Sequence, residues 1–190
     1  MARKEQAEEP KGANPKLVIA SIVGIVVIIA VVALFLTLPP GTDPNSNGQD
    51  FPPVEPGEIT TFIDSGEDIE LIDGKPVIRL FSTTWCPHCK WIKPTYDRVA
   101  KEYVDAGKIV AYHWEVDTAD DTLTLFPEGG VPATETSVFR KFNPGGSIPT
   151  FVFGGKYYRV GNGHERQDDL VAEEAEFRGV IEALILEASG

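Results

Sequence analysis

Residues 85–90 read Trp-Cys-Pro-His-Cys-Lys, and this stretch decides how the chain folds. It holds the only 2 cysteines of the 190 residues, Cys86 and Cys89, three positions apart. An apolar run at residues 76–81 leads into it, and a helix-like pattern follows it. A thiol at the start of a helix faces unpaired backbone N–H groups and the positive end of the helix dipole, which favour the thiolate. Because the thiolate attacks disulfides, a dithiol that cycles with its own disulfide is the simplest interpretation.

Two other uses of the cysteine pair remain open. A structural zinc site needs four ligands, and no second cysteine pair exists to supply them. His88, His113 and His164 are the other candidate ligands, but their scatter through the chain gives no ligand spacing. A purely structural disulfide gains little, because closing so short a loop removes little chain entropy. We therefore expect no metal, and no cofactor other than the redox-active pair itself.

An uncharged apolar run at residues 17–38 predicts a transmembrane helix, since about 20 apolar helical residues cover the hydrocarbon core of a bilayer. The run ends in Leu-Pro-Pro without the small-residue pattern of a cleavage site, so an uncleaved anchor is favoured over a removed signal peptide. The cations near the run all precede it, and the next positive residue is Lys75. The positive-inside rule therefore predicts a single-pass protein with a cytoplasmic N-terminus and an extracytoplasmic C-terminal domain.

Four segments organise the chain. Residues 1–16 are charged and broken by proline and glycine, as in a disordered cytoplasmic tail, and residues 17–38 are the expected transmembrane anchor. Residues 39–57 form a Pro/Gly-rich linker, and residues 58–190 are the expected folded domain. The net charge of −12 gives the chain no electrostatic reason to bind nucleic acid, and solubility is the simplest account of it.

Strand and helix patterns alternate through the folded domain. Residues 58–74 are the least determined part and hold one or two short strands. Gly107 ends the first long helix, and Pro94 should kink it. The expected elements after residue 74 are a buried strand at 76–82, a helix at 86–105, a strand at 108–116, an irregular excursion at 118–134, a short helix at 135–142, a strand at 147–153, its hairpin partner at 156–160 and a helix within 167–188.

The last helix shows an amphipathic pattern. Its apolar face consists of Leu170, Phe177, Ile181 and Leu184. Its glutamates lie largely off that face: Glu173, Glu174, Glu176 and Glu182.

Four features make residues 58–190 resemble the thioredoxin superfamily. They are the strand that runs into the cysteine pair, Pro94 five residues after Cys89, the Gly-Ser-Ile-Pro-Thr-Phe-Val-Phe strand at residues 146–153, and the hairpin followed by an acidic helix. The resemblance implies an α/β domain with the thioredoxin fold, a central mixed β-sheet flanked by helices. In this chain one N-terminal transmembrane helix is expected to precede it.

The resemblance also implies a substrate site. In the family the proline that matches Pro149 is cis and packs against the cysteine pair, and the residue before it, here Ile148, presents its backbone to an extended substrate. A trans proline at the start of a strand is the other interpretation. Trp85 and Thr150 border these positions, and by the same resemblance we expect them to contact substrate.

Pro87 and His88, between the cysteines, tune the chemistry. Cys-Pro-His-Cys is similar to the motif of the bacterial periplasmic disulfide oxidases. In the first helical turn, His88 can place positive charge beside the Cys86 sulfur. Stabilising that thiolate stabilises the reduced form, which makes the disulfide a stronger oxidant. His88 as a solvent-facing residue without influence is the plainer alternative.

Two departures from the family patterns bear on this direction. The oxidases insert a helical subdomain before the cis proline, whereas the excursion at 118–134 is too short for one and reads as a surface loop or a substrate rim. The buried acid of thioredoxins, six residues before the first cysteine, is replaced by Leu80, and the family's buried lysine falls on His113. His113 is therefore a candidate for moving protons near Cys89, although a partly exposed strand histidine is the favoured interpretation.

We therefore expect an extracytoplasmic thiol–disulfide oxidoreductase that acts on protein cysteines. Cys86 forms the mixed disulfide, Cys89 resolves it, and the direction leans towards disulfide formation or isomerisation. Its partners are protein thiols or disulfides and a membrane or soluble redox protein, because one transmembrane helix without cysteine cannot relay electrons. The alternatives are a thioredoxin-fold reductase, a copper or zinc chaperone or adaptor, and a domain with a vestigial pair.

Overall fold

The computed structural model describes residues 59–190. The expected tail, membrane anchor and linker lie outside the described residues, so these three assignments stay predictions. Within residues 59–190, none of the helices is both long enough and apolar enough to cross a bilayer.

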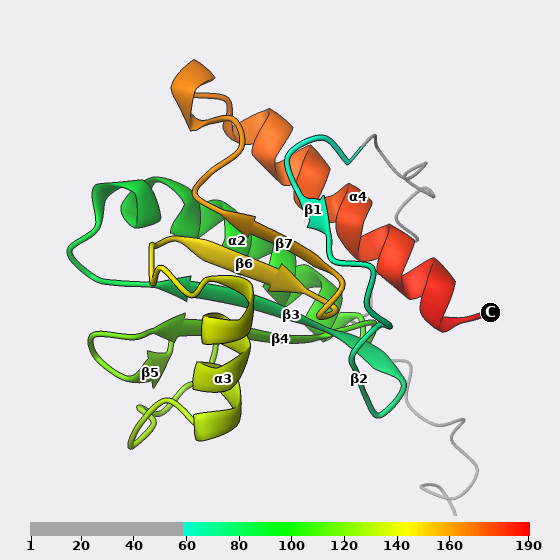
Figure 1. The fold of residues 1–190 in the computed structure, drawn as a ribbon, viewed down its shortest axis with the longest axis horizontal. Helices are drawn as coiled ribbons and strands as arrows, with labels where there is room; N and C mark the ends of the chain where they lie inside the picture. The colour runs from blue at the N-terminus through cyan, green and yellow to red at the C-terminus, as the bar shows by residue number, and fades with distance from the viewer. Residues whose placement is uncertain (1–58) are drawn as a thin grey trace, which may run out of the picture. The chain divides into compact units, whose positions relative to one another are not determined.

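The central strand of the sheet is β3 (Lys75–Ser82), the strand that leads into the cysteine pair (Figure 1). All of its residues except Lys75 are buried, as its continuous apolar sequence predicts for a strand covered on both faces. β4 (Val110–Glu115) runs parallel to β3 on one side, and β6 (Thr150–Phe153) runs antiparallel on the other. The remaining strands are β7 (Tyr157–Val160) and β1 (Ile63–Asp64) beyond β6, β5 (Asp120–Asp121) beyond β4, and β2 (Leu71–Ile72), which pairs with the start of β3.

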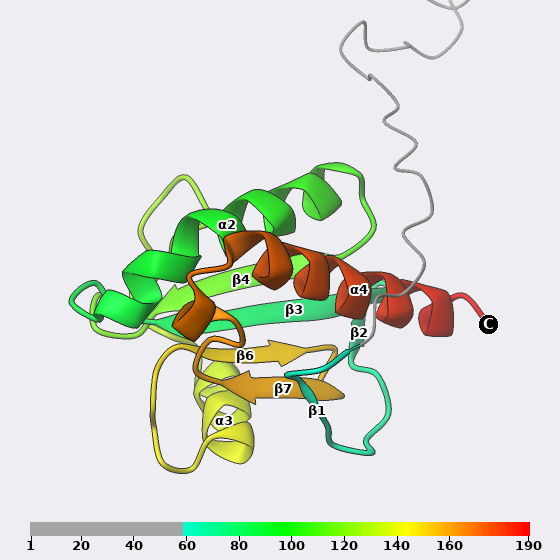
Figure 2. The ribbon, with the colours of Figure 1, turned by 90° about the horizontal axis from the view of Figure 1, so that it is seen from above.

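Helices cover both faces of the sheet (Figure 2). α2 (Pro87–Asp105) and α4 (Leu170–Ala188) lie on one face, and α3 (Ala133–Phe142) lies on the other. A short 3₁₀ turn, η1 (Glu165–Gln167), comes just before α4. β3 and β4 can be parallel because α2 supplies the long crossover that a parallel pair requires. A mixed sheet between helices in this order is the thioredoxin fold that the resemblance implied.

Each face of the sheet carries its own apolar cluster. On the α2 and α4 face, aromatic rings dominate, and Phe151, Phe153 and Phe177 are fully buried with Tyr96 packed against them. On the α3 face the cluster is smaller and contains Phe81, Trp114, Phe142 and Val152. Because β3 contributes to both clusters, the end of β3 is held rigidly where α2 begins.

The observed boundaries follow the expected ones with small shifts. α3 begins two residues earlier than expected, at Ala133. β6 begins at Thr150 rather than at residue 147, because residues 148–149 form a bend that contains the cis peptide bond. The excursion at 118–134 contains the short strand β5, which pairs antiparallel with the end of β4. Pro94 lies inside α2, as expected.

Two glutamates of α4 that lie off its predicted apolar face are buried. Glu173 is fully buried and Glu176 is 6% exposed, because both pair with Arg159 of β7. Arg159 is itself 4% exposed, and its guanidinium lies over the rings of Phe62, Phe151 and Phe177. Charged groups are buried in proteins chiefly when they are paired, and this pairing satisfies both signs.

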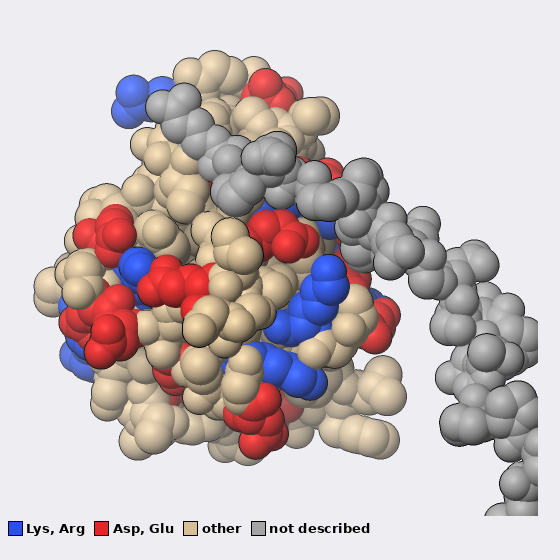
Figure 3. All heavy atoms as spheres, turned by 90° about the vertical axis from the view of Figure 1, so that its right-hand side faces the viewer, with Lys and Arg blue, Asp and Glu red and all other residues tan. Residues whose placement is uncertain are grey.

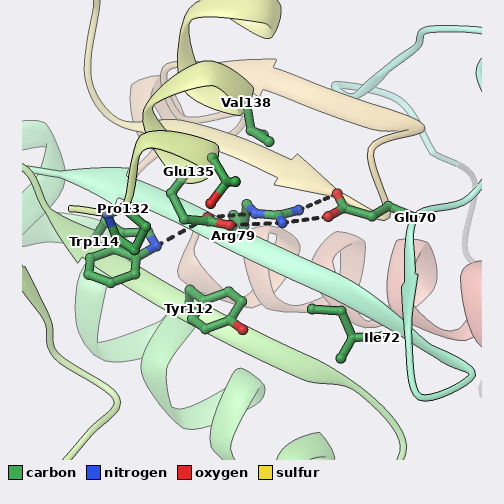
Figure 4. Close-up of a pocket in the computed structure, with 9 residues that line it drawn as sticks. Glu70, Ile72, Arg79, Tyr112, Trp114, Pro132, Glu135 and Val138 are labelled. Atoms are coloured by element: carbon green, nitrogen blue, oxygen red, sulfur yellow. Dashed lines mark hydrogen bonds and ion pairs between the residues drawn. The ribbon is translucent and has the colours of Figure 1, made fainter.

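A second buried arginine crosses the other face of the sheet. Arg79 of β3 is held between Glu70 and Glu135, as Figure 4 shows, with Nε 2.7 Å from Glu135 Oε2 and Nη1 2.6 Å from Glu70 Oε2. Trp114 Nε1 also donates to Glu135 Oε2, at 3.2 Å. These groups line a surface hollow of about 350 Å³. Because both carboxylates bind the guanidinium, Arg79 ties α3 and the segment before β2 to the central strand.

The described acidic and basic side chains are interspersed on the side of the domain shown in Figure 3, around the C-terminus. Some form ion pairs across elements, such as Lys156 with Glu187 at 2.8 Å. Mixed charges of this kind keep a surface soluble.

Candidate active site

Cys86 occupies the N-cap position of α2. Its Sγ accepts a hydrogen bond from the backbone N–H of Cys89 at 3.3 Å, the contact that a serine or aspartate oxygen makes at most helix starts. Pro87 follows as the first helical residue, where its missing N–H removes no helix bond. The Cys86 sulfur therefore lies at the end of α2 where backbone N–H groups lack carbonyl partners within the helix. The prediction that the cysteine pair opens a helix is confirmed.

The loop between β3 and α2 is pinned by Asp117, just after β4. The Asp117 carboxylate accepts hydrogen bonds from the backbone N–H of Thr84, at 3.0 Å, and from its hydroxyl. Burial alone would raise the pKa of Asp117, but the hydrogen bonds from Thr84 outweigh it and lower the pKa. Trp85 projects from this pinned loop with 67% of its surface exposed, next to Cys86. Its proposed contact with substrate stays a prediction.

Cys89 lies one turn further along α2 and is fully buried, whereas Cys86 is 3% exposed. Burial raises the pKa of the Cys89 thiol to about 12, and the Cys86 sulfur adds to this as hydrogen-bond partner and as negative charge. The backbone N–H of Thr83 and the charge of Lys93 act in the opposite direction. Both cysteines are free thiols in this structure. The two sulfurs are therefore unequal, with Cys86 placed to react first and Cys89 to follow.

The loop before β6 faces the cysteine pair. The Ile148–Pro149 peptide bond is cis, as the resemblance implied. The Cys86 thiol lies 3.9 Å from the carbonyl oxygen of Ile148 and donates to it. Pro149 is buried and Ile148 is half-buried. The backbone of residue 148 is thus the part of this loop that lies beside the reactive sulfur.

The resemblance implied that Thr150 contacts substrate, but the position of its side chain does not fit such a contact. Its side chain is fully buried, and its hydroxyl donates to the carbonyl oxygen of Ser147 at 2.7 Å. Asn143 Nδ2, after the end of α3, donates to the same hydroxyl at 2.7 Å and to the Ser147 carbonyl at 2.6 Å. The Thr150 side chain therefore shapes the proline loop from inside and does not face substrate.

His88 lies on the exposed side of the first turn of α2, with 61% of its side chain in solvent. Its Nδ1 lies 2.7 Å from Oε1 of Glu165 in η1. Asn162 Nδ2 donates to Glu165 Oε2 at 2.8 Å and to the His88 carbonyl oxygen at 3.0 Å. Sequence reasoning identified His88 but missed Glu165, because 77 positions separate them and no periodic pattern joins them.

His113 is fully buried, so the favoured interpretation of a partly exposed strand histidine is wrong. Its Nε2 lies 2.8 Å from the Ser82 hydroxyl, and its Nδ1 lies 2.5 Å from Asp97 Oδ1. Leu80, at the position of the family's acid, is a fully buried core residue opposite His113 in the β3–β4 pair. The structure thus brings His113 to the end of β3, between a buried hydroxyl and a half-exposed carboxylate.

A second charged pair lies at the same end of the sheet. Lys93, one helical turn after Cys89, forms an ion pair with Glu115 of β4, and their side chains are 16% and 15% exposed. Glu115 stands opposite Ser82 in the β3–β4 register, next to the Thr83 N–H that binds the Cys89 sulfur. The sequence carried one usable signal for this pair, because the i, i+4 spacing puts Lys93 on the same face of α2 as Cys89.

The described side chains do not offer the arrangement that a bound metal ion needs. In the part of the chain from Ile59 onward, no group of three or more His, Cys, Asp and Glu side chains is arranged to hold a metal ion. The ring nitrogens of His113 bind Ser82 and Asp97. The absence of a metal and of any cofactor beyond the cysteine pair stays a prediction.

Comparisons with known proteins bear on the domain as a whole. The model of the family described as Thioredoxin matches residues 66–140. The thioredoxin of Pseudomonas aeruginosa is 33% identical over 86 residues, which cover 40% of this chain and 77% of that protein. Bloodstream-specific protein 2 of Trypanosoma brucei brucei is 35% identical over 86 residues, or 38% of this chain, and a protein disulfide-isomerase of Aspergillus oryzae is 28% identical over 88 residues, or 45% of this chain.

These relatives differ in how much of their length is matched. The chain spans only 17% of the length of the trypanosomal protein and of the fungal isomerase. The bacterial thioredoxin, in contrast, is matched over most of its length at one-third identity. With a cysteine pair at the start of α2, a cis proline beside it and this sheet order, the chain belongs to the thioredoxin family.

Proposed function

We propose that this chain is a thiol–disulfide oxidoreductase that acts on protein cysteines from outside the cytoplasm. The observation that carries the proposal is the inequality of the two sulfurs. Cys86 caps the helix and touches the backbone of Ile148, while burial raises the pKa of Cys89 to about 12. A two-step exchange requires one sulfur that substrate can reach, here Cys86 beside the backbone of Ile148, and a second sulfur that is shielded, here Cys89.

The proposed oxidising cycle begins with the Cys86–Cys89 disulfide. A substrate thiolate attacks the Cys86 sulfur, the bond to Cys89 breaks, and Cys89 leaves with the electron pair and takes up a proton. A second substrate thiolate then attacks the substrate sulfur of the mixed disulfide and releases Cys86 as a thiolate. The substrate gains a disulfide, and the enzyme pair gains two electrons, which a redox partner must remove. Ile148, Pro149 and Trp85 are the proposed substrate contacts.

Proton handling at Cys89 is part of the proposal. In the isomerase or reductase direction Cys89 must lose its proton before it resolves the mixed disulfide, and Leu80 cannot accept that proton. His113 lies between Ser82, next to the Thr83 N–H that binds Cys89, and Asp97, whose side chain is 35% exposed. We propose that this chain of groups carries a proton between the interior and solvent.

The direction rests on Pro87 and His88. A positive imidazole in the first turn stabilises the thiolate of the reduced form and makes the disulfide more oxidising. Equilibration of the full chain with glutathione measures this as a reduction potential. We expect a value of about −180 to −120 mV, as in disulfide isomerases and oxidases, whereas about −270 mV, as in thioredoxin, would overturn the oxidising direction.

The location rests on the apolar run at residues 17–38 and the cations before it, which lie outside the described residues. An epitope placed after Gly190 tests it. Antibody binding to cells with an intact plasma membrane is expected, and binding only after permeabilisation would put the domain in the cytoplasm.

A further inference from the structure

Glu165 holds the histidine of the active-site motif from outside the motif. Its carboxylate lies 2.7 Å from His88 Nδ1 through Oε1, and its Oε2 accepts from Asn162 at 2.8 Å. The same Asn162 amide donates to the His88 carbonyl oxygen at 3.0 Å. The segment that contains η1 therefore forms hydrogen bonds with both the side chain and the backbone of His88.

This segment is anchored at further points, so the position of Glu165 is fixed. Asp168 Oδ1 accepts from Trp91 Nε1 of α2 at 2.8 Å. On the other side, the backbone N–H of His164 donates to the buried Glu173 at 2.8 Å. Because His164 and Asp168 flank η1, the carboxylate of Glu165 is held against the first turn of α2.

The charge of this carboxylate opposes that of His88. Positive charge in the first turn of α2, two residues after Cys86, stabilises the thiolate of the reduced form and so raises the oxidising power of the disulfide. A carboxylate at 2.7 Å from the imidazole offsets part of that positive charge as seen from the sulfur. Both side chains are partly exposed, at 61% and 29%, so solvent screens the effect without removing it.

We propose that Glu165 is a positioning residue that acts through His88 to restrain the oxidising power of the Cys86–Cys89 disulfide. The inference rests on the proposed dithiol–disulfide cycle. The charge of the motif's histidine is thus partly offset by a residue from a segment 77 positions away. The potential of this protein is thus set jointly by α2 and by the segment before α4.

The test is the redox equilibrium of the full chain with glutathione at pH 6.0. Two glutathione thiols are oxidised to one glutathione disulfide, and the Cys86–Cys89 bond breaks to give two thiols that take up the two electrons and two protons. Four proteins are compared with the wild type: Glu165→Gln, His88→Ala, the double variant, and Glu187→Gln as a control carboxylate at the far end of α4. Glutamine at 165 keeps an oxygen for the Asn162 amide.

We expect Glu165→Gln to shift the equilibrium about three- to tenfold towards the dithiol, or about 15–30 mV at about 30 mV per tenfold. The shift should disappear when His88 is alanine, and Glu187→Gln should match the wild type. An unchanged equilibrium in Glu165→Gln, a shift in the other direction, or the same shift without His88 would overturn the inference. Failure of the wild type itself to exchange with glutathione would instead overturn the proposed function.

Discussion

Replacement of Glu176 by alanine should remove a large part of the stability of this domain. Its carboxylate accepts from the backbone N–H groups of Thr60 and Thr61 at 2.7 and 2.5 Å, and from the Thr61 hydroxyl at 2.6 Å. It also lies 3.3 Å from Arg159 Nη1 and 3.2 Å from His164 Nε2. One side chain therefore connects the segment before β1, the strand β7 and the loop that holds Glu165.

The expected loss in free energy of unfolding depends on which groups the alanine leaves without a partner. Breaking one side of a buried ion pair costs about 3–5 kcal/mol. Here Glu173 still pairs with Arg159, and water can reach exposed Thr60, so we expect a loss of about 2–4 kcal/mol in the free energy of unfolding. Glu176→Gln keeps one acceptor oxygen and should lose about 1–2 kcal/mol. Glu187→Ala, which removes the surface pair with Lys156, should lose at most about 1 kcal/mol.

The pH dependence gives an independent check. Burial would raise the pKa of Glu176, but hydrogen bonds from Thr61 and Thr60 and the charge of Arg159 outweigh it, so the pKa lies below the ordinary 4.5. A lowered carboxylate pKa contributes stability that is complete above the ordinary value and is lost as the pH falls through the folded value. The difference between wild type and Glu176→Gln should thus stay constant from pH 7.5 to pH 5.5 and shrink below about pH 4.

The assay is urea unfolding of the full chain, kept in solution with a non-ionic detergent and followed by tryptophan fluorescence. Midpoint and slope give the free energy of unfolding at each pH. If Glu176→Ala lost less than about 1 kcal/mol, no more than the surface control, the buried cluster would not hold the domain together as described.

Two further substitutions test the site. Gly163→Ala should cost about 1–3 kcal/mol in unfolding free energy, because the new methyl would lie 2.5 Å from both Arg159 Nη1 and Thr61 Oγ1. Gly145→Ala is the matched control, since its methyl would meet nothing closer than 3.6 Å. Equal losses in the two variants would contradict this packing. Lys93→Met removes the positive charge that lowers the pKa of Cys89, so resolution of a preformed mixed disulfide at pH 7.5 should slow about three- to tenfold, as measured by acid quenching at set times. Lys101→Met, on the exposed face of α2, should leave this rate unchanged, and an unchanged rate in Lys93→Met would refute the role of Lys93.

The sequence predicted the parts of this structure that depend on local pattern. The apolar run before the cysteines became β3, the helical spacing after them became α2, and Cys86 is at the junction. The cis bond before Pro149 could be expected only through the family resemblance, because proline alone permits either isomer.

The rest depends on contacts between distant residues. Periodicity separated Glu173 and Glu176 from the apolar face of α4, but it could not show that Arg159 is their buried partner. Similarly, the partner of His88 comes from a loop 77 positions away, and the burial of His113 depends on α2 packing over β4. Residue type suggested each functional group, but only the tertiary structure shows which groups neutralise one another.

Cys86, and not Cys89, is the sulfur that forms the mixed disulfide with substrate, and trapping tests this most directly. The full-length variants Cys89→Ser and Cys86→Ser are reduced, mixed with a disulfide-bonded reporter protein, and examined by mass spectrometry of their peptides. We predict that Cys89→Ser accumulates a stable mixed disulfide on Cys86, while Cys86→Ser forms almost none, because Cys89 is fully buried and burial raises the pKa of its thiol. Comparable adducts on Cys89 in the Cys86→Ser variant, or no adduct in Cys89→Ser, would contradict the account.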